Sequence, residues 1–76
     1  MKTIRELVDG IDYIEIEYRT CTPDGYDILT GYAEYERGRL SSLDGDCYSL
    51  DDVVSQWKFN SDMTLTVWYE SRWITG

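Results

Sequence analysis

The alternation of apolar and polar residues is the sequence feature that most constrains this fold. Ile14, Ile16 and Tyr18 occupy every second position, and Glu15 and Glu17 stand between them. This period of two is typical of a β-strand with one buried face and one exposed face. The same pattern recurs in residues 26–37 and in residues 63–70. The sequence therefore predicts a mainly β chain.

The other expected elements are short. Thr3 and Glu6 form a capping-box pattern that predicts a helix over residues 3–9, followed by Gly10 as its stop. Turn residues at 22–25, 37–39 and 60–62 separate the strands expected at 11–20, 26–37, 40–43, 56–59 and 63–70. Residues 49–52 fit either a helix start capped by Ser49 or a bent loop.

The alternation also assigns side chains to faces. In residues 26–37, one face takes Leu29, Gly31, Ala33 and Tyr35, and the other takes Thr30, Tyr32, Glu34 and Glu36. In the last strand, Met63, Leu65, Val67 and Tyr69 alternate with Thr64, Thr66 and Trp68. Trp57 and Phe59 are expected to share a face and to lie across the hairpin from Met63, Leu65 and Val67.

These elements predict an α+β fold that is mainly β. A short N-terminal helix packs against a curled or barrel-like antiparallel sheet of about five strands. Residues 1–76 form a single domain, because two domains would each be too small to bury a core.

Composition excludes several classes of function. Fifteen Asp and Glu residues against seven Lys and Arg give a net charge of −8, which disfavours direct binding to nucleic acid or to anionic membranes. The chain has no histidine, so it cannot build Ser-His or Cys-His nucleophilic pairs. No glycine-rich phosphate loop occurs. We expect a protein that is not an enzyme, with no catalytic residues, no cofactor and no metal site.

Localisation is expected to be cytoplasmic. The N-terminus is too polar for a secretory signal, and no apolar run approaches the roughly 20 residues of a membrane span. Cys21 and Cys47 are then expected to be reduced thiols, with a disulfide between them as the alternative.

Four glutamates are the first candidate site. Glu15 and Glu17 are two residues apart, as are Glu34 and Glu36, which places each pair about 6.6 Å apart on one face of a strand. Such rows of carboxylates could mimic nucleic-acid phosphates towards a basic groove, and the alternative is an ordinary solvated sheet face. Asp62 is expected in a turn far from these glutamates.

Two further sets could bind a partner. Asp44, Asp46, Asp51 and Asp52 form an acidic loop, although Asp44 also fits a turn, Asp52 also fits a helix cap, and the spacing is not that of an EF-hand. Tyr32, Trp68 and Trp73 are candidate interface aromatics, because tyrosine and tryptophan are favoured in protein interfaces. The alternative is that the two half-buried faces of the sheet need these rings.

The second half of the chain carries a resemblance. Residues 40–52 (LSSLDGDCYSLDD) and 65–70 (LTVWYE) resemble a stretch found in small uncharacterised acidic proteins of Firmicutes and their mobile elements. This resemblance implies no particular activity. In size, acidity and lack of a catalytic set, the chain is also similar in general type to anti-CRISPR and other anti-defence proteins.

The leading hypothesis is an acidic binding protein of the phage or mobile-element type that inhibits or regulates a nucleic-acid-handling partner. It would occupy the basic surface of that partner, for which a CRISPR effector or another nuclease is the candidate. The alternative is a non-catalytic interaction or oligomerisation module that docks through exposed aromatics, including docking onto a second copy of itself.

Overall fold

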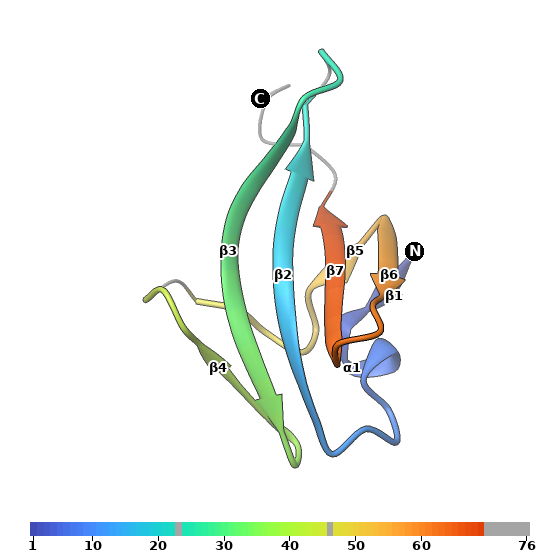
Figure 1. Cartoon of the computed structure of the whole chain (residues 1–76), viewed down its shortest axis with the longest axis vertical. Coiled ribbons are helices and arrows are strands. Elements are labelled where there is room, and N and C mark those ends of the chain that lie inside the picture. Colours follow the sequence, from blue (N-terminus) through green and yellow to red (C-terminus); the bar gives the residue numbers. More distant parts are fainter. Residues whose placement is uncertain (23, 46, 70–76) are drawn as a thin grey trace.

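The computed structural model describes residues 1–22, 24–45 and 47–69. Figure 1 shows a long, bent sheet with a short helix and a connecting segment on one side of it. The described elements are β1 (Lys2–Thr3), α1 (Ile4–Leu7), β2 (Tyr13–Cys21), β3 (Asp27–Glu36), β4 (Arg39–Ser42), β5 (Val53–Val54), β6 (Gln56–Phe59) and β7 (Thr64–Tyr69). The mainly β fold with a short N-terminal helix is confirmed.

The main sheet has five strands in the order β4-β3-β2-β7-β6. Three of its four strand pairs are antiparallel, and the pair of β2 with β7 is parallel. The expected sheet of about five strands is confirmed, and the expected antiparallel pairing holds for every pair except β2 with β7. The expected curled or barrel-like closure was wrong, because β4 and β6 remain at the two edges.

The segment from residue 43 to residue 55 explains the parallel pair. It leaves the β3 side, where the Leu43 N–H donates to the Tyr32 carbonyl, and reaches the β7 side, where the Ser55 N–H donates to the Trp68 carbonyl. In Figure 1 this yellow segment passes behind β2. The chain therefore crosses one face of the sheet before it forms β6 and β7, and β7 enters beside β2 in the same direction.

Packing holds this crossing segment against the sheet. The ring of Tyr48 stacks on Tyr18 of β2 at 4.0 Å between centroids, and Tyr69 of β7 stacks on Tyr18 at 5.6 Å. Gly31 makes room for the segment, because a Cβ at this position would collide with the Asp44 carboxylate and the Tyr48 hydroxyl. We call this side of the sheet the covered face.

Helix α1 completes the covered face. Its predicted capping box is confirmed, since the Glu6 N–H donates to the Thr3 hydroxyl and the Thr3 N–H donates to the Glu6 carboxylate. The Thr3 backbone and side chain lower the pKa of Glu6 by favouring its charged form. The helix ends at Leu7 rather than at residue 9, and β1 ties it to β5 through a two-residue antiparallel ladder.

Residues 49–52 form a turn and not a helix. The Ser49 N–H donates to the Asp52 carboxylate at 2.9 Å, and the Asp51 N–H donates to the Ser49 hydroxyl at 3.1 Å. Strand β5 starts immediately afterwards, at Val53. The bent-loop alternative is the one the structure adopts.

The β6–β7 hairpin agrees with its predicted register. Trp57 lies opposite Val67 and Phe59 lies opposite Leu65, so these side chains share the covered face. Met63 was placed wrongly, because it precedes β7 with a positive φ of 64° and is 63% exposed. A residue in this left-handed conformation belongs to the turn.

Leu29 was also assigned to the wrong face. The β2–β3 ladder pairs Tyr18 with Gly31 but Arg19 with Leu29, so Thr30 is an extra residue at a β-bulge. An extra residue shifts the alternation by one position. Leu29 therefore lies with Arg19 on the polar side of the sheet, and it is 44% exposed.

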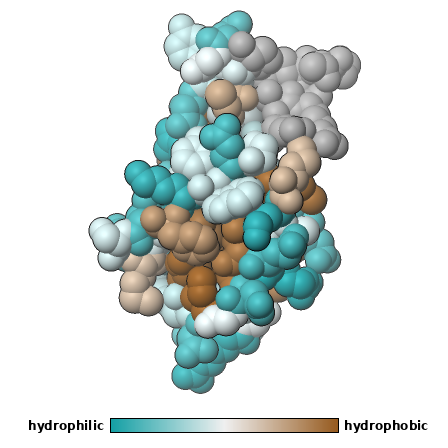
Figure 2. All heavy atoms as spheres, turned by 90° about the vertical axis from the view of Figure 1, so that its right-hand side faces the viewer, coloured by the Kyte–Doolittle hydropathy of each residue, from teal (hydrophilic) through white to brown (hydrophobic). Residues whose placement is uncertain are grey.

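The buried core lies between the sheet and its cover. Its members include Ile4 and Val8 from the α1 region, Ile16 and Tyr18 of β2, and Leu65 of β7. The cover is incomplete near β6, where Phe59 is 49% exposed although it shares a face with buried Leu65. Figure 2 looks onto this β6 side and shows apolar surface in its middle, framed by hydrophilic residues.

Candidate functional site

The other side of the sheet, which we call the open face, carries the polar half of the alternation. Its central strand β2 presents Tyr13, Glu15, Glu17 and Arg19, between the buried positions that pack on the cover. The strand register brings neighbouring side chains beside these residues: Glu36, Glu34 and Tyr32 from β3, Thr64, Thr66 and Trp68 from β7, and Gln56 and Lys58 from β6.

The predicted glutamates meet on this face. Glu15 lies directly opposite Glu34 across the β2–β3 ladder, and Glu17 lies opposite Tyr32. The Tyr13 hydroxyl is 3.1 Å from Glu15 Oε1 and 3.1 Å from Glu34 Oε2. A hydroxyl has one proton, so it can donate to only one of these carboxylates at a time. The other carboxylate is then left beside a like charge.

Tyr13 keeps its proton in this setting. Partial burial, followed by the hydrogen bonds to Glu34 and Glu15, raises the pKa of Tyr13 to about 12. The hydroxyl therefore remains a hydrogen-bond donor to these two carboxylates at neutral pH. Among the described residues, no lysine or arginine forms an ion pair with Glu15, Glu34 or Glu36.

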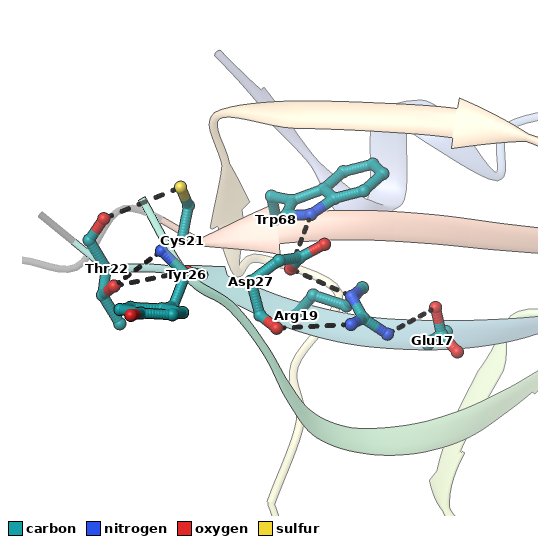
Figure 3. Close-up of polar contacts among 7 residues, drawn as sticks. All are labelled: Glu17, Arg19, Cys21, Thr22, Tyr26, Asp27 and Trp68. Atoms are coloured by element: carbon teal, nitrogen blue, oxygen red, sulfur yellow. Dashed lines mark hydrogen bonds and ion pairs between the residues drawn. The ribbon is translucent and has the colours of Figure 1, made fainter. Parts of the chain in front are cut away.

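A second group of charged side chains on the open face is partly neutralised by ion pairs within the group. Arg19 donates through Nε to Asp27 Oδ1 at 2.9 Å and through Nη1 to Glu17 Oε1 at 3.4 Å. The Trp68 indole N–H donates to the same Asp27 oxygen at 3.1 Å. Figure 3 shows this chain of contacts running from β2 across to β3 and β7. Trp68 is thus held in place by a side chain of its own sheet.

A groove of about 560 Å³ lies on the open face. Its lining joins Glu15 and Glu17 of β2 and Tyr32 of β3 to the β6–β7 hairpin, which contributes Lys58 and Asp62. The expectation that Asp62 lies far from the glutamates was wrong. The parallel pairing of β2 with β7 brings the start of β7, and the turn before it, alongside Glu15.

The predicted acidic loop does not join this face. Asp44 accepts from the Tyr32 N–H at 2.9 Å and from the Tyr48 hydroxyl at 3.1 Å, so it fastens the crossing segment to β3. Asp52 accepts from the Tyr69 hydroxyl at 3.1 Å on the covered side, and Asp51 pairs with Arg5 at 3.1 Å. Asp44 and Asp52 therefore hold parts of the fold together, Asp51 forms an exposed ion pair, and Asp46 lies outside the described residues.

The candidate aromatics also separate. Tyr32 is on the open face and 43% exposed, whereas Trp68 is on the same face but half-buried beside Asp27. Trp73 lies outside the described residues. Of the two described rings, that of Tyr32 is the more accessible to a partner.

Lys58 and Asp62 are the site residues that sequence reasoning missed. They belong to the β6–β7 hairpin, and its distance from β2 depends on the order of the strands in the sheet. The alternation of apolar and polar residues along a strand does not encode this order. The contact of Trp68 with Asp27 was missed for the same reason, since these residues are 41 positions apart in the chain.

Comparison with known proteins found no match to the chain among family models, curated proteins or solved structures. In the described part of the chain, no helix is long and apolar enough to cross a membrane.

Cys21 and Cys47 are both free and exposed.

Proposed function

We propose that the chain is a non-catalytic binding protein that lays its open face on the basic surface of a nucleic-acid-handling partner. Binding there would inhibit or regulate the partner by occupying the groove that nucleic acid needs. A CRISPR effector or another nuclease is the candidate partner, in keeping with a protein of the phage or mobile-element type.

The observation that carries this proposal is the pairing of Glu15 with Glu34 in the middle of an open sheet face. Along each strand the outward glutamates repeat at about 6.6 Å, and opposite residues on neighbouring strands are about 5 Å apart. Two short rows of negative charge result. Their repeat is close to the separation of successive phosphates along a nucleic-acid strand, which exceeds the axial rise of roughly 3.4 Å per nucleotide because the strand also follows a helical path.

Like charges directly opposite each other destabilise a sheet. The Tyr13 hydroxyl relieves this repulsion for only one of the two carboxylates at a time. The fold therefore gains nothing from having both Glu15 and Glu34. A basic partner surface would gain from both, because it removes the repulsion when it docks.

The second candidate function is docking or self-association through aromatics, supported by the exposed ring of Tyr32. Ionic strength separates the two. Charge-driven docking weakens steeply above about 0.15 M salt, whereas docking through apolar rings does not.

A matched pair of charge reversals tests the proposal. The immobilised chain is used to capture a partner from a lysate of its source organism, and binding is measured for variants of equal net charge. In the first variant Glu15, Glu17, Glu34 and Glu36 become lysine. In the control Asp9, Asp12, Asp24 and Asp51 become lysine; these are exposed residues outside the open face.

We expect the first variant to lose partner binding by at least a hundredfold, because like charges across an interface cost several kcal/mol. Glu15 and Glu36 are exposed, so each of these substitutions should cost the fold only tenths of a kcal/mol, whereas those at half-buried Glu17 and Glu34 should each cost about 1 kcal/mol. We expect the control to bind within about tenfold of the wild type and added nucleic acid to compete with the wild type. If both variants lose partner binding equally, binding depends on the net charge of the chain and not on the open face. If the first variant binds the partner as tightly as the wild type, the open face is not the binding surface.

A further inference from the structure

The groove on the open face combines anionic, aromatic and hydroxyl side chains. Glu15 and Glu17 lie on its β2 side, Tyr32 lies on its β3 side, and Asp62 and Lys58 lie on the hairpin side. Its volume of about 560 Å³ is within the range of about 300–1,000 Å³ seen for sites that enclose small molecules. It can therefore take at least one long side chain.

The hairpin side of the groove is held in a fixed arrangement. The Asn60 amide donates to the Thr64 hydroxyl at 3.0 Å and to the Thr66 hydroxyl at 3.1 Å. The Thr64 hydroxyl in turn donates to the Asp62 carboxylate. This network fixes where Asp62 stands before any ligand arrives, and such pre-organisation lowers the entropy cost of binding.

The charge of the groove selects a cation. Three carboxylates, those of Glu15, Glu17 and Asp62, face one ammonium group, that of Lys58. Arg19 forms an ion pair with Glu17, but through a single contact of 3.4 Å between Nη1 and Oε1. The groove thus retains negative charge that the protein itself does not neutralise.

The geometry distinguishes between the two cationic side chains of proteins. A guanidinium group is planar, stacks on an aromatic face and donates two parallel hydrogen bonds to a carboxylate. A lysine ammonium is a strongly hydrated point charge that uses neither feature fully. Glu17 and Tyr32 lie opposite each other across the β2–β3 ladder and both line the groove, so a flat cation bound in the groove can meet the carboxylate and the ring.

We infer that this groove is a receptor for an arginine side chain of the protein partner, bound between the Tyr32 ring and the carboxylates of Glu15, Glu17 and Asp62. The inference rests on the proposed function, and it adds that the docking surface of the partner presents arginine at its centre. The chain is then expected to bind basic surfaces that present arginine more tightly than those that present lysine.

Two peptides of equal length and charge, nona-arginine and nona-lysine, test this inference by calorimetric titration. Because the two peptides carry equal charge, the ratio of their dissociation constants reports the preference for arginine over lysine and not the effect of charge. We expect the wild-type chain to bind nona-arginine about tenfold more tightly than nona-lysine, in keeping with a stacking contact to a tyrosine. The Tyr32→Phe variant keeps the ring and should keep this preference.

The Tyr32→Ala variant should reduce the preference to less than about twofold, because it removes the stacking surface. Tyr26→Ala is the matched control, since Tyr26 is 70% exposed in the β2–β3 turn and does not line the groove. It should leave the preference unchanged.

The outcomes separate this inference from the proposed function. Equal affinities for the two peptides, both lost when the four glutamates are reversed, would overturn the arginine receptor and leave the acidic docking face intact. A tenfold preference that survives Tyr32→Ala would also overturn the inference. Failure of the wild type to bind either peptide at low salt would contradict both.

Discussion

The two faces of the sheet are built from alternate residues of the same strands, yet their side chains are used differently. On the covered face Ile16 and Tyr18 are fully buried, and the Tyr18 ring stacks with the rings of Tyr48 and Tyr69. On the open face, one residue away, Glu15 and Glu17 line a groove. The difference indicates that the covered face determines the fold, while the open face is available for binding.

Truncation of a core residue should give the largest difference between the faces. Leu65→Ala removes a fully buried side chain of β7, so we expect a loss of about 2–4 kcal/mol in the free energy of unfolding, measured by denaturant titration. Gln56→Ala, on the open side of the neighbouring strand, should change it by less than about 0.5 kcal/mol. A loss below about 0.5 kcal/mol for Leu65→Ala would show that the faces are assigned the wrong way round.

The tyrosine stack allows a finer test of the covered face. The Tyr69 hydroxyl donates to Asp52, whereas the buried Tyr18 hydroxyl finds no hydrogen-bond partner within the described residues. We expect Tyr69→Phe to lower the free energy of unfolding by about 1–2 kcal/mol, because Asp52 loses a donor. Tyr18→Phe should raise it by up to about 1 kcal/mol, because it removes an unsatisfied polar group. Equal losses in both variants would contradict this distinction.

The free energy of unfolding at alkaline pH gives an independent test of the environment of Tyr69. Burial, and then the neighbouring Asp52 carboxylate, raise the pKa of Tyr69 above that of an unfolded tyrosine, which is about 10. The folded state thus holds a proton that the unfolded state loses above about pH 10. Stability contributed by this group is complete below that pH and falls as the pH rises, and the fall should be smaller in Tyr69→Phe.

Calcium should have the smallest effect. Asp44, Asp51 and Asp52 are engaged with β3, Arg5 and Tyr69 respectively, and in the described part of the chain no three carboxylates or thiols are grouped to hold a metal ion. We expect millimolar calcium to leave the melting temperature unchanged apart from the effect of ionic strength. A micromolar site would stabilise the protein by about 4 kcal/mol at a thousandfold excess, and such a rise would restore these residues as ligands.

The sequence predicted the features that depend on local pattern. The alternation in residues 14–18 correctly separated buried from outward side chains, and Thr3 with Glu6 located the start of the helix. These predictions succeeded because side-chain direction along a strand and capping of a helix are set by residues close in sequence.

The features that failed depend on contacts between distant residues. The parallel pairing of β2 with β7 follows from the path of residues 43–55 across the covered face, and this pairing brings Asp62 into the groove. The bulge at Thr30 moved Leu29 to the open face, although nothing in the local alternation marks it. The candidate site was therefore half predicted: its glutamates and Tyr32 were found, and its hairpin side was not.

The most direct test of the open face as the binding surface is a heteronuclear NMR titration of the labelled chain with nona-lysine, a basic probe without aromatic preference. We expect the amide resonances of Glu15, Glu17, Tyr32 and Glu34 to move together and saturate. Those of exposed acids elsewhere, such as Asp9 and Asp24, should move little. Shifts of equal size at all acidic residues, or shifts confined to residues 44–52, would contradict binding at the open face.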